Sequence, residues 1–195
     1  MGRTDIRLFA GLLWLVSLAP ALAHTGNIGG GFVGGLTHPV FGPDHVAAMV
    51  AVGLWGAVLG PPAIFILPVV FPLVMALGGT LGILGVPIPG VEVGIAVSAA
   101  VLGMMVALAA RPPMWVAAAL VGAFAIFHGH AHGTELPPGA DAAAYSAGFV
   151  VATGGLHLAG IAFGLLARRP WGRLAVRALG GGIAIAGLIF LGRGI

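Results

Sequence analysis

Residues 38–45 read HPVFGPDH, and this stretch interrupts an apolar run that extends over residues 29–59. A proline has no backbone N–H to donate, so Pro39 and Pro43 each leave a carbonyl group one helical turn earlier without its partner. A continuous helix through this run would lack two backbone hydrogen bonds within about one turn of each other. The stretch therefore predicts a helix that is broken at Pro39 and Pro43, with its polar residues gathered at the break.

The composition of the chain assigns it to a membrane. Of its 195 residues, 59% are hydrophobic and 7% are charged, and the mean hydropathy is +1.13. A soluble domain carries about a quarter charged residues, so a soluble enzyme is excluded and an all-α integral membrane protein is expected. The lipid bilayer is its expected surrounding, and the net charge of +3 gives no indication of nucleic acid. The absence of cysteine excludes disulfides and thiolate metal ligands.

The N-terminus has the pattern of a secretory signal peptide. Arginines precede an apolar run over residues 8–18, and Ala21-Leu22-Ala23 then fits the A-x-A cleavage pattern. An uncleaved first helix is the alternative. Cleavage would remove residues 1–23 and make His24 the mature N-terminus, outside the cytoplasm.

The rest of the chain, residues 24–195, is predicted to form a single transmembrane domain. At about 20 residues per span it has room for six helices, and six apolar stretches are present. Proline, glycine and arginine separate neighbouring stretches, as expected of the loops between spans. The predicted spans cover residues 29–59, 63–84, 91–110, 114–132, 142–166 and 174–192.

The arginines predict the orientation of this bundle. If the mature N-terminus lies outside, the loops at residues 60–62, 111–113 and 168–173 face the cytoplasm, and they hold four of the six arginines of residues 24–195. Glu135 and Asp141 lie on the opposite side. This is the positive-inside bias, and it predicts a multi-pass protein of the bacterial inner membrane with both termini outside the cytoplasm. The chain has no lysine and no glycine-rich P-loop, so ATP is excluded as a partner.

His38, Asp44 and His45 form the first candidate site. A charged carboxyl group within a membrane costs about 3 kcal/mol on insertion scales, so ionisable groups there are functional by default. Irregular backbone at membrane depth is tolerated where it lines a polar cavity, and transporters build ion sites from broken helices. Imidazoles, a carboxylate and carbonyl groups at one place therefore predict an ion site. The alternative is that Asp44 and His45 pair only with each other and hold the bundle together.

The second candidate site is the run FHGHAHGTE, residues 127–135. On a helix, His128, His132 and Glu135 fall on one face, and imidazoles with a carboxylate suit a divalent metal such as Ni, Co or Zn. If the segment instead unwinds at its glycines, His128, His130 and His132 would line up along an extended strand. A solvated, histidine-rich loop without function is the third interpretation.

Glu92, His157 and His24 are further candidates. Glu92, at the start of the third predicted span, is a ligand, a proton carrier or an exposed residue of the outer interface. His157 lies in the middle of a span, where a buried neutral histidine that donates to a carbonyl group is the plain alternative to a role in transport. His24, as a mature N-terminus, would set an α-amine beside an imidazole at the entrance.

Taken together, these motifs resemble the HupE/UreJ family of nickel permeases. The pattern His38-Pro-x-x-Gly-x-Asp-His45 matches the family signature, and the residues around Phe71, Glu92, Phe127–Glu135 and His157 continue it. The resemblance covers essentially the whole mature chain. It implies a six-helix secondary carrier for nickel, or sometimes cobalt, with a cleaved leader and no permanently bound cofactor. Its role would be to supply metal for hydrogenase or urease maturation. The functional positions that it implies are His38, Asp44, His45, Phe71, Glu92, His132 and Glu135.

We therefore expect a permease rather than an enzyme, but other classes of protein stay open. An intramembrane metal-dependent hydrolase would use three metal ligands, a water molecule and an acid–base carboxylate, which Asp44 or Glu92 would supply. Against it, no pattern in the chain marks a lipid or peptide substrate site. A metal-binding membrane protein without transport is the other class. The sequence leaves open nickel against cobalt, uniport against proton coupling, and monomer against homo-oligomer.

Overall fold

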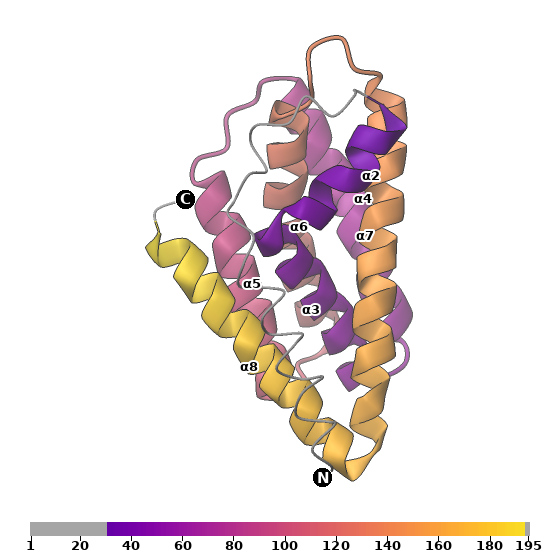
Figure 1. Cartoon of the computed structure of the whole chain (residues 1–195). Helices are drawn as coiled ribbons and strands as arrows, with labels where there is room; N and C mark the ends of the chain where they lie inside the picture. The colour runs from indigo at the N-terminus through magenta and orange to yellow at the C-terminus, as the bar shows by residue number, and fades with distance from the viewer. Residues whose placement is uncertain (1–30, 194–195) are drawn as a thin grey trace.

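A computed structural model describes residues 31–193, and all regular structure in that range is helical (Figure 1). The predicted signal peptide and His24 lie outside the described residues. An all-α fold is confirmed for the described part of the chain. The helices are α2 (Phe32–Phe41), α3 (Pro43–Leu59), α4 (Ala63–Ile83), α5 (Val91–Ala107), α6 (Met114–Thr134), α7 (Ala142–Gly164), the 3-10 helix η1 (Leu165–Arg168) and α8 (Pro170–Gly192).

Several of these helices are long and apolar enough to cross a membrane. Four segments of the described chain qualify by themselves, namely α4, α6, α7 with η1, and α8. The pair α2 and α3 counts as a fifth if the two helices are taken as one bent span. α5 is shorter, with 17 residues. The chain is therefore a multi-pass membrane protein, whereas the six spans stay a prediction.

The first predicted span is broken as expected, but at one place only. α2 and α3 meet at an angle of 86°, and Gly42 between them has an extended backbone conformation. Pro43 opens α3, and a residue that precedes a proline is driven out of helical geometry. Pro39 instead lies inside α2, so the predicted break there is wrong. Its missing N–H removes a hydrogen bond without ending the helix.

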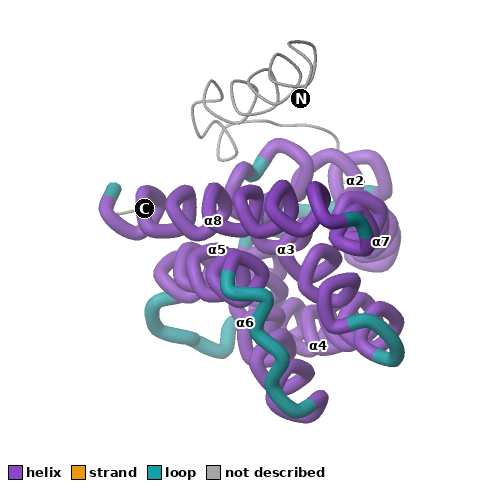
Figure 2. Tube along the Cα trace, turned by 90° about the horizontal axis from the view of Figure 1, so that it is seen from below, coloured by secondary structure: helices purple, strands orange, loops and turns teal. Residues whose placement is uncertain are grey.

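α3 lies in the middle of the bundle and contacts α2, α4, α5, α7 and α8 (Figure 2). Around it, α4 packs along α6, and α5 packs along α8. Glycines bring α4 and α6 close together: a Cβ atom at Gly129 would overlap the Met75 carbonyl oxygen, and one at Gly78 would overlap that of Ile126. Small residues allow membrane helices to approach in this way. The contact fixes the part of α6 that carries the histidines.

Candidate metal site

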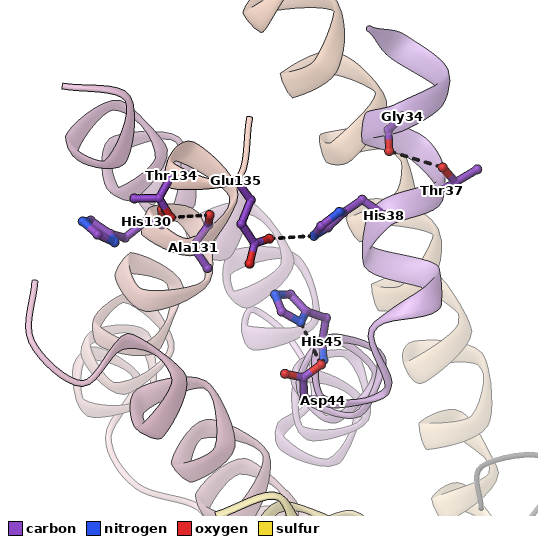
Figure 3. A network of polar contacts seen from close by, with 9 residues as sticks. All are labelled: Gly34, Thr37, His38, Asp44, His45, His130, Ala131, Thr134 and Glu135. Atoms are coloured by element: carbon purple, nitrogen blue, oxygen red, sulfur yellow. Dashed lines mark hydrogen bonds and ion pairs between the residues drawn. The ribbon is translucent and has the colours of Figure 1, made fainter. Parts of the chain in front are cut away.

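Three side chains meet where α2 and α6 end. The ligand atoms of His38, His132 and Glu135 all lie within 4.8 Å of one another, and we call these residues the ligand group. His38 belongs to the last turn of α2, His132 to the last turn of α6, and Glu135 directly follows α6. Figure 3 shows the contact between the side chains of His38 and Glu135, and their Nε2 and Oε2 atoms are 3.1 Å apart. Imidazoles and a carboxylate at this spacing can share one divalent metal ion.

Asp44 and His45 open α3 beside the ligand group. The Asp44 Oδ1 atom accepts hydrogen bonds from the His45 backbone N–H at 2.9 Å and from the His45 Nδ1 atom at 2.9 Å. The pairing that the sequence offered as an alternative is thus present, but it uses only one ring nitrogen. The other, Nε2, is buried and has no hydrogen-bond partner among the described residues. A histidine that binds a metal through one ring nitrogen commonly donates the N–H of the other to a carboxylate in this way.

The histidines of α6 lie on different faces of the helix. His128 and His132 face His45, with distances between ring centres of 4.9 and 4.6 Å. His130 points away from His45 in Figure 3, and its Nε2 atom donates to the Val86 carbonyl oxygen at 2.7 Å. α6 is a continuous helix, and its histidines are buried. The extended strand and the solvated loop are therefore both wrong. His130 is a predicted ligand that the structure places outside the ligand group.

Ser98 of α5 fixes the orientation of His128. Its Oγ atom donates to the Ile95 carbonyl oxygen at 2.6 Å, so it accepts from His128 Nε2, which lies 2.9 Å away. The His128 ring proton is therefore on Nε2, and Nδ1 keeps its electron pair. Sequence reasoning missed this role, for which a single serine within an apolar span is the only signal.

His38, His45, His128 and His132 form what we call the histidine cluster. Within the described part of the chain, its buried ring nitrogens without a hydrogen-bond partner are His45 Nε2, His128 Nδ1 and both nitrogens of His132. Leaving one buried polar group unpaired costs about 1–3 kcal/mol, so a cluster of them needs an explanation. A transition-metal ion would satisfy one nitrogen of each neutral ring by accepting its electron pair. The donor set therefore fits a metal cation.

Phe71 and His157 continue the row of rings beyond the histidine cluster. The centre of the Phe71 ring lies 5.4 Å from that of His128 and 5.3 Å from that of His157, and all of these side chains are buried. Phe71 thus contacts both His157 and the His128 ring of the cluster. Glu92, in the first turn of α5, is not a member of the ligand group. Ser98 of α5 contacts the cluster through His128.

Fold and site define a multi-pass helical membrane protein with a histidine–carboxylate ligand group. A family-wide sequence profile described as HupE / UreJ protein matches residues 12–190. Protein HupE of Rhizobium leguminosarum bv. viciae is 47% identical over 171 residues, which cover 88% of this chain and 90% of that relative. No solved structure shows significant similarity to the chain. The chain therefore belongs to the HupE/UreJ family, and the resemblance of its motifs is confirmed.

Proposed function

We propose that this protein is a permease that imports a divalent transition-metal cation, with Ni²⁺ as its main cargo and Co²⁺ as the alternative. The ligand group carries the proposal, because it brings the donor atoms of His38, His132 and Glu135 within 4.8 Å of one another. The unpaired buried nitrogens of the histidine cluster lie next to it. Membership of the HupE/UreJ family supports the same function. The cargo would serve the maturation of a metalloenzyme such as a hydrogenase or a urease.

The donor chemistry accounts for a metal but does not select nickel. Imidazole and carboxylate groups suit Ni²⁺, Co²⁺ and Zn²⁺. The intrinsic affinity of any such site for Cu²⁺ is higher than its affinity for Ni²⁺. Selection therefore has to come from geometry and from the metals that are supplied. The ligand group comes from α2 and from the end of α6, so the angle between these helices sets its geometry. The family resemblance is what favours nickel as the cargo.

We take the row of imidazole rings as the path of the cation. The distances between ring centres are 4.8 Å for His38 and His132, 4.6 Å for His132 and His45, and 4.9 Å for His45 and His128. A cation that leaves the ligand group thus finds a neighbouring imidazole ring less than 5 Å away, centre to centre, at each transfer along the row. Transfer between neighbouring donors lets a new bond form before the old one is lost. The cation would cross this part of the protein without passing an apolar stretch.

Phe71 follows the last imidazole of this row, and its ring carries no donor atom. We place the barrier of the path there, with His157 as the first donor behind it. Entry needs no ATP, because two positive charges that move down a membrane potential gain about 4–5 kcal/mol per 100 mV. A bacterial inner membrane, with the ligand group facing outward, would supply this potential in the inward direction.

Accumulation of metals in cells tests the proposal. Cells that express the wild type or Asp44→Asn, with matched amounts of inserted protein, receive Ni, Co, Zn, Mn and Cu at nanomolar concentration. Their metal content is then measured by mass spectrometry. Asp44→Asn keeps the size of the side chain but removes the charge that orients His45. We expect nickel or cobalt to rise only in cells with the wild-type protein.

The same experiment separates the other classes of protein. No rise of any metal with a correctly inserted wild type would overturn the permease, and lipid-hydrolysis assays on purified protein would then test the hydrolase. Metal binding by the purified protein without accumulation in cells would indicate a membrane protein that binds metal but does not transport it. Normal uptake by Asp44→Asn would show that the path does not need the Asp44 carboxylate.

A further inference from the structure

A pocket of about 620 Å³ opens at the end of the bundle opposite the ligand group. It lies where α3 and α5 end and where η1 passes into α8, and these helix ends are at the bottom of the bundle in Figure 1. Arg111, Arg168, Arg173 and Arg177 line it, and we call it the arginine pocket. Arg111 is far in the sequence from the other three arginines, so the fold brings it to them.

The arginine pocket gathers four positive charges from the described part of the chain. No acidic residue of the described range 31–193 lines it. Arg111 Nη2 donates to the Val58 carbonyl oxygen at 2.8 Å, and Arg177 Nε donates to that of Ala107 at 2.7 Å. These contacts hold two guanidinium groups at the ends of α3 and α5, and each group keeps further N–H donors. Like charges around one hollow repel each other, so a bound anion would relieve the repulsion.

The remaining wall of the pocket is largely apolar. Val58, Ala167 and Val176 contribute to it, and so does Leu174, whose side chain is 74% exposed. Trp171, in the first turn of α8, is exposed as well. Tryptophan and arginine at the end of a transmembrane helix are typical of the headgroup level of a bilayer. A ligand that suits both parts of the wall carries an anionic group for the arginines and hydrocarbon for the apolar residues.

We propose that the arginine pocket binds the phosphate group of an anionic membrane lipid such as phosphatidylglycerol. Arginine pairs with phosphate through two parallel N–H···O bonds, and basic pockets between transmembrane helices bind anionic headgroups. The positive-inside bias explains arginines on one side of the membrane, but it does not require them to line one pocket. A free phosphate ion would leave the apolar wall unused. Bound there, the lipid bridges the ends of α3 and α5 to the start of α8.

Arg169 provides a matched control for testing this site. It directly follows Arg168 and is exposed, but it does not line the pocket. The full chain, purified in detergent, is mixed with equal amounts of phosphatidylglycerol and phosphatidylcholine, and native mass spectrometry counts the lipids that each protein retains. The proteins compared are the wild type, Arg168→Gln/Arg173→Gln and Arg169→Gln. Arg111 and Arg177 keep their backbone contacts in each of them.

The wild type is expected to prefer phosphatidylglycerol by at least about fivefold, because a single arginine near an anionic headgroup contributes about that factor. The double variant should lose the preference, and Arg169→Gln should keep it. Equal retention of the two lipids by the wild type would overturn the proposal, and so would equal losses in the double variant and Arg169→Gln. Displacement of phosphatidylglycerol by millimolar inorganic phosphate would also overturn it, since the pocket would then be a site for small anions. If the double variant does not fold, Arg173→Gln alone provides the comparison.

Discussion

The ligand group and the arginine pocket lie at opposite ends of the bundle, and α6 runs from one to the other. α6 begins shortly after Arg111 and ends directly before Glu135, and its 21 residues extend over about 30 Å. At the first end, the histidines of α6 are buried beside other imidazoles. At the second end, the arginines are exposed around a hollow.

Both ends contain basic side chains, but the two kinds of side chain differ in whether they can lose a proton. An imidazole can give up its proton and offer an electron pair to a cation, so it can be buried while neutral. A guanidinium group keeps its charge and can only donate, so it needs acceptors such as carbonyl groups, water or an anion. The bundle thus separates an end that suits cations from an end that suits anions. The following predictions test this separation, starting with the largest expected effect.

His132→Gln should abolish nickel uptake at nanomolar concentration, whereas His130→Gln should retain most of it. His132 belongs to the ligand group. Loss of a group that only hydrogen-bonds to a metal ligand weakens metal binding by up to roughly 100-fold, and loss of a ligand itself should weaken it more. His130 lies on the same helix but contacts the Val86 carbonyl oxygen, a bond that glutamine can keep. The measurement is nickel accumulation in cells with matched protein levels. Equal losses in both variants would mean that the two faces of α6 are not functionally different.

Gly129→Ala should lower the stability of the folded protein by about 1–3 kcal/mol, the usual cost of overpacking a core. The added Cβ atom would overlap the Met75 carbonyl oxygen of α4. Gly181→Ala in α8 is the control, because a Cβ atom there meets nothing within 4 Å. Thermal unfolding in detergent should show a lower midpoint for Gly129→Ala only. Equal midpoints would show that α4 and α6 can move apart at little cost.

Ser98→Ala should raise the nickel concentration that gives half-maximal uptake by about fivefold, because a buried hydrogen bond contributes about 1 kcal/mol. The variant removes the oxygen that accepts from His128 Nε2, so the ring is no longer held with Nδ1 ready to bind. Ser146→Ala is the control, since Ser146 is exposed on α7. Uptake is measured over a range of nickel concentrations. Identical curves for both variants would remove Ser98 from the site.

The smallest effect is expected from the arginine pocket on metal affinity. Arg168→Gln/Arg173→Gln should change the nickel concentration at half-maximal uptake by less than about twofold, because charges about 30 Å away are screened by salt. The measurement is the same uptake curve, compared with that of Arg169→Gln. A larger shift that is specific to the double variant would show that the two ends are coupled through the helices.

The sequence predicted the parts of this arrangement that depend on local rules. The break near Pro43 follows from the restriction that a proline imposes on the residue before it, and the common face of His128 and His132 follows from the helical period. Local rules also misled at Pro39. The lost N–H predicted a break there, but α2 continues through Pro39 to its end at Phe41, so the one missing hydrogen bond lies too close to the helix end to break it earlier.

The rest of the site depends on contacts between helices, which no local pattern contains. Whether His128, His130 or His132 faces the other ligands is decided by the side of α6 that packs on α4, and this side follows from the fit of glycines such as Gly129. The role of Ser98 depends on the approach of α5 to α6. The arginines were expected on one side of the membrane, but their convergence on one pocket needed the fold.

The bend at Gly42 also affects the electric field at the ligand group, because it places a helix end there. Each helix carries about half a negative charge at its C-terminal end, where the last carbonyl groups have no partner. α2 and α6 both end at the ligand group, whereas a straight helix through residues 32–59 would have no end there. The positive end of α3 opens at the same break, and the Asp44 carboxylate lies against it. A cation at the ligand group therefore gains roughly 0.3–1 kcal/mol from the C-terminal end of α2 and a similar amount from that of α6, with up to about 2 kcal/mol where such an end is partly buried.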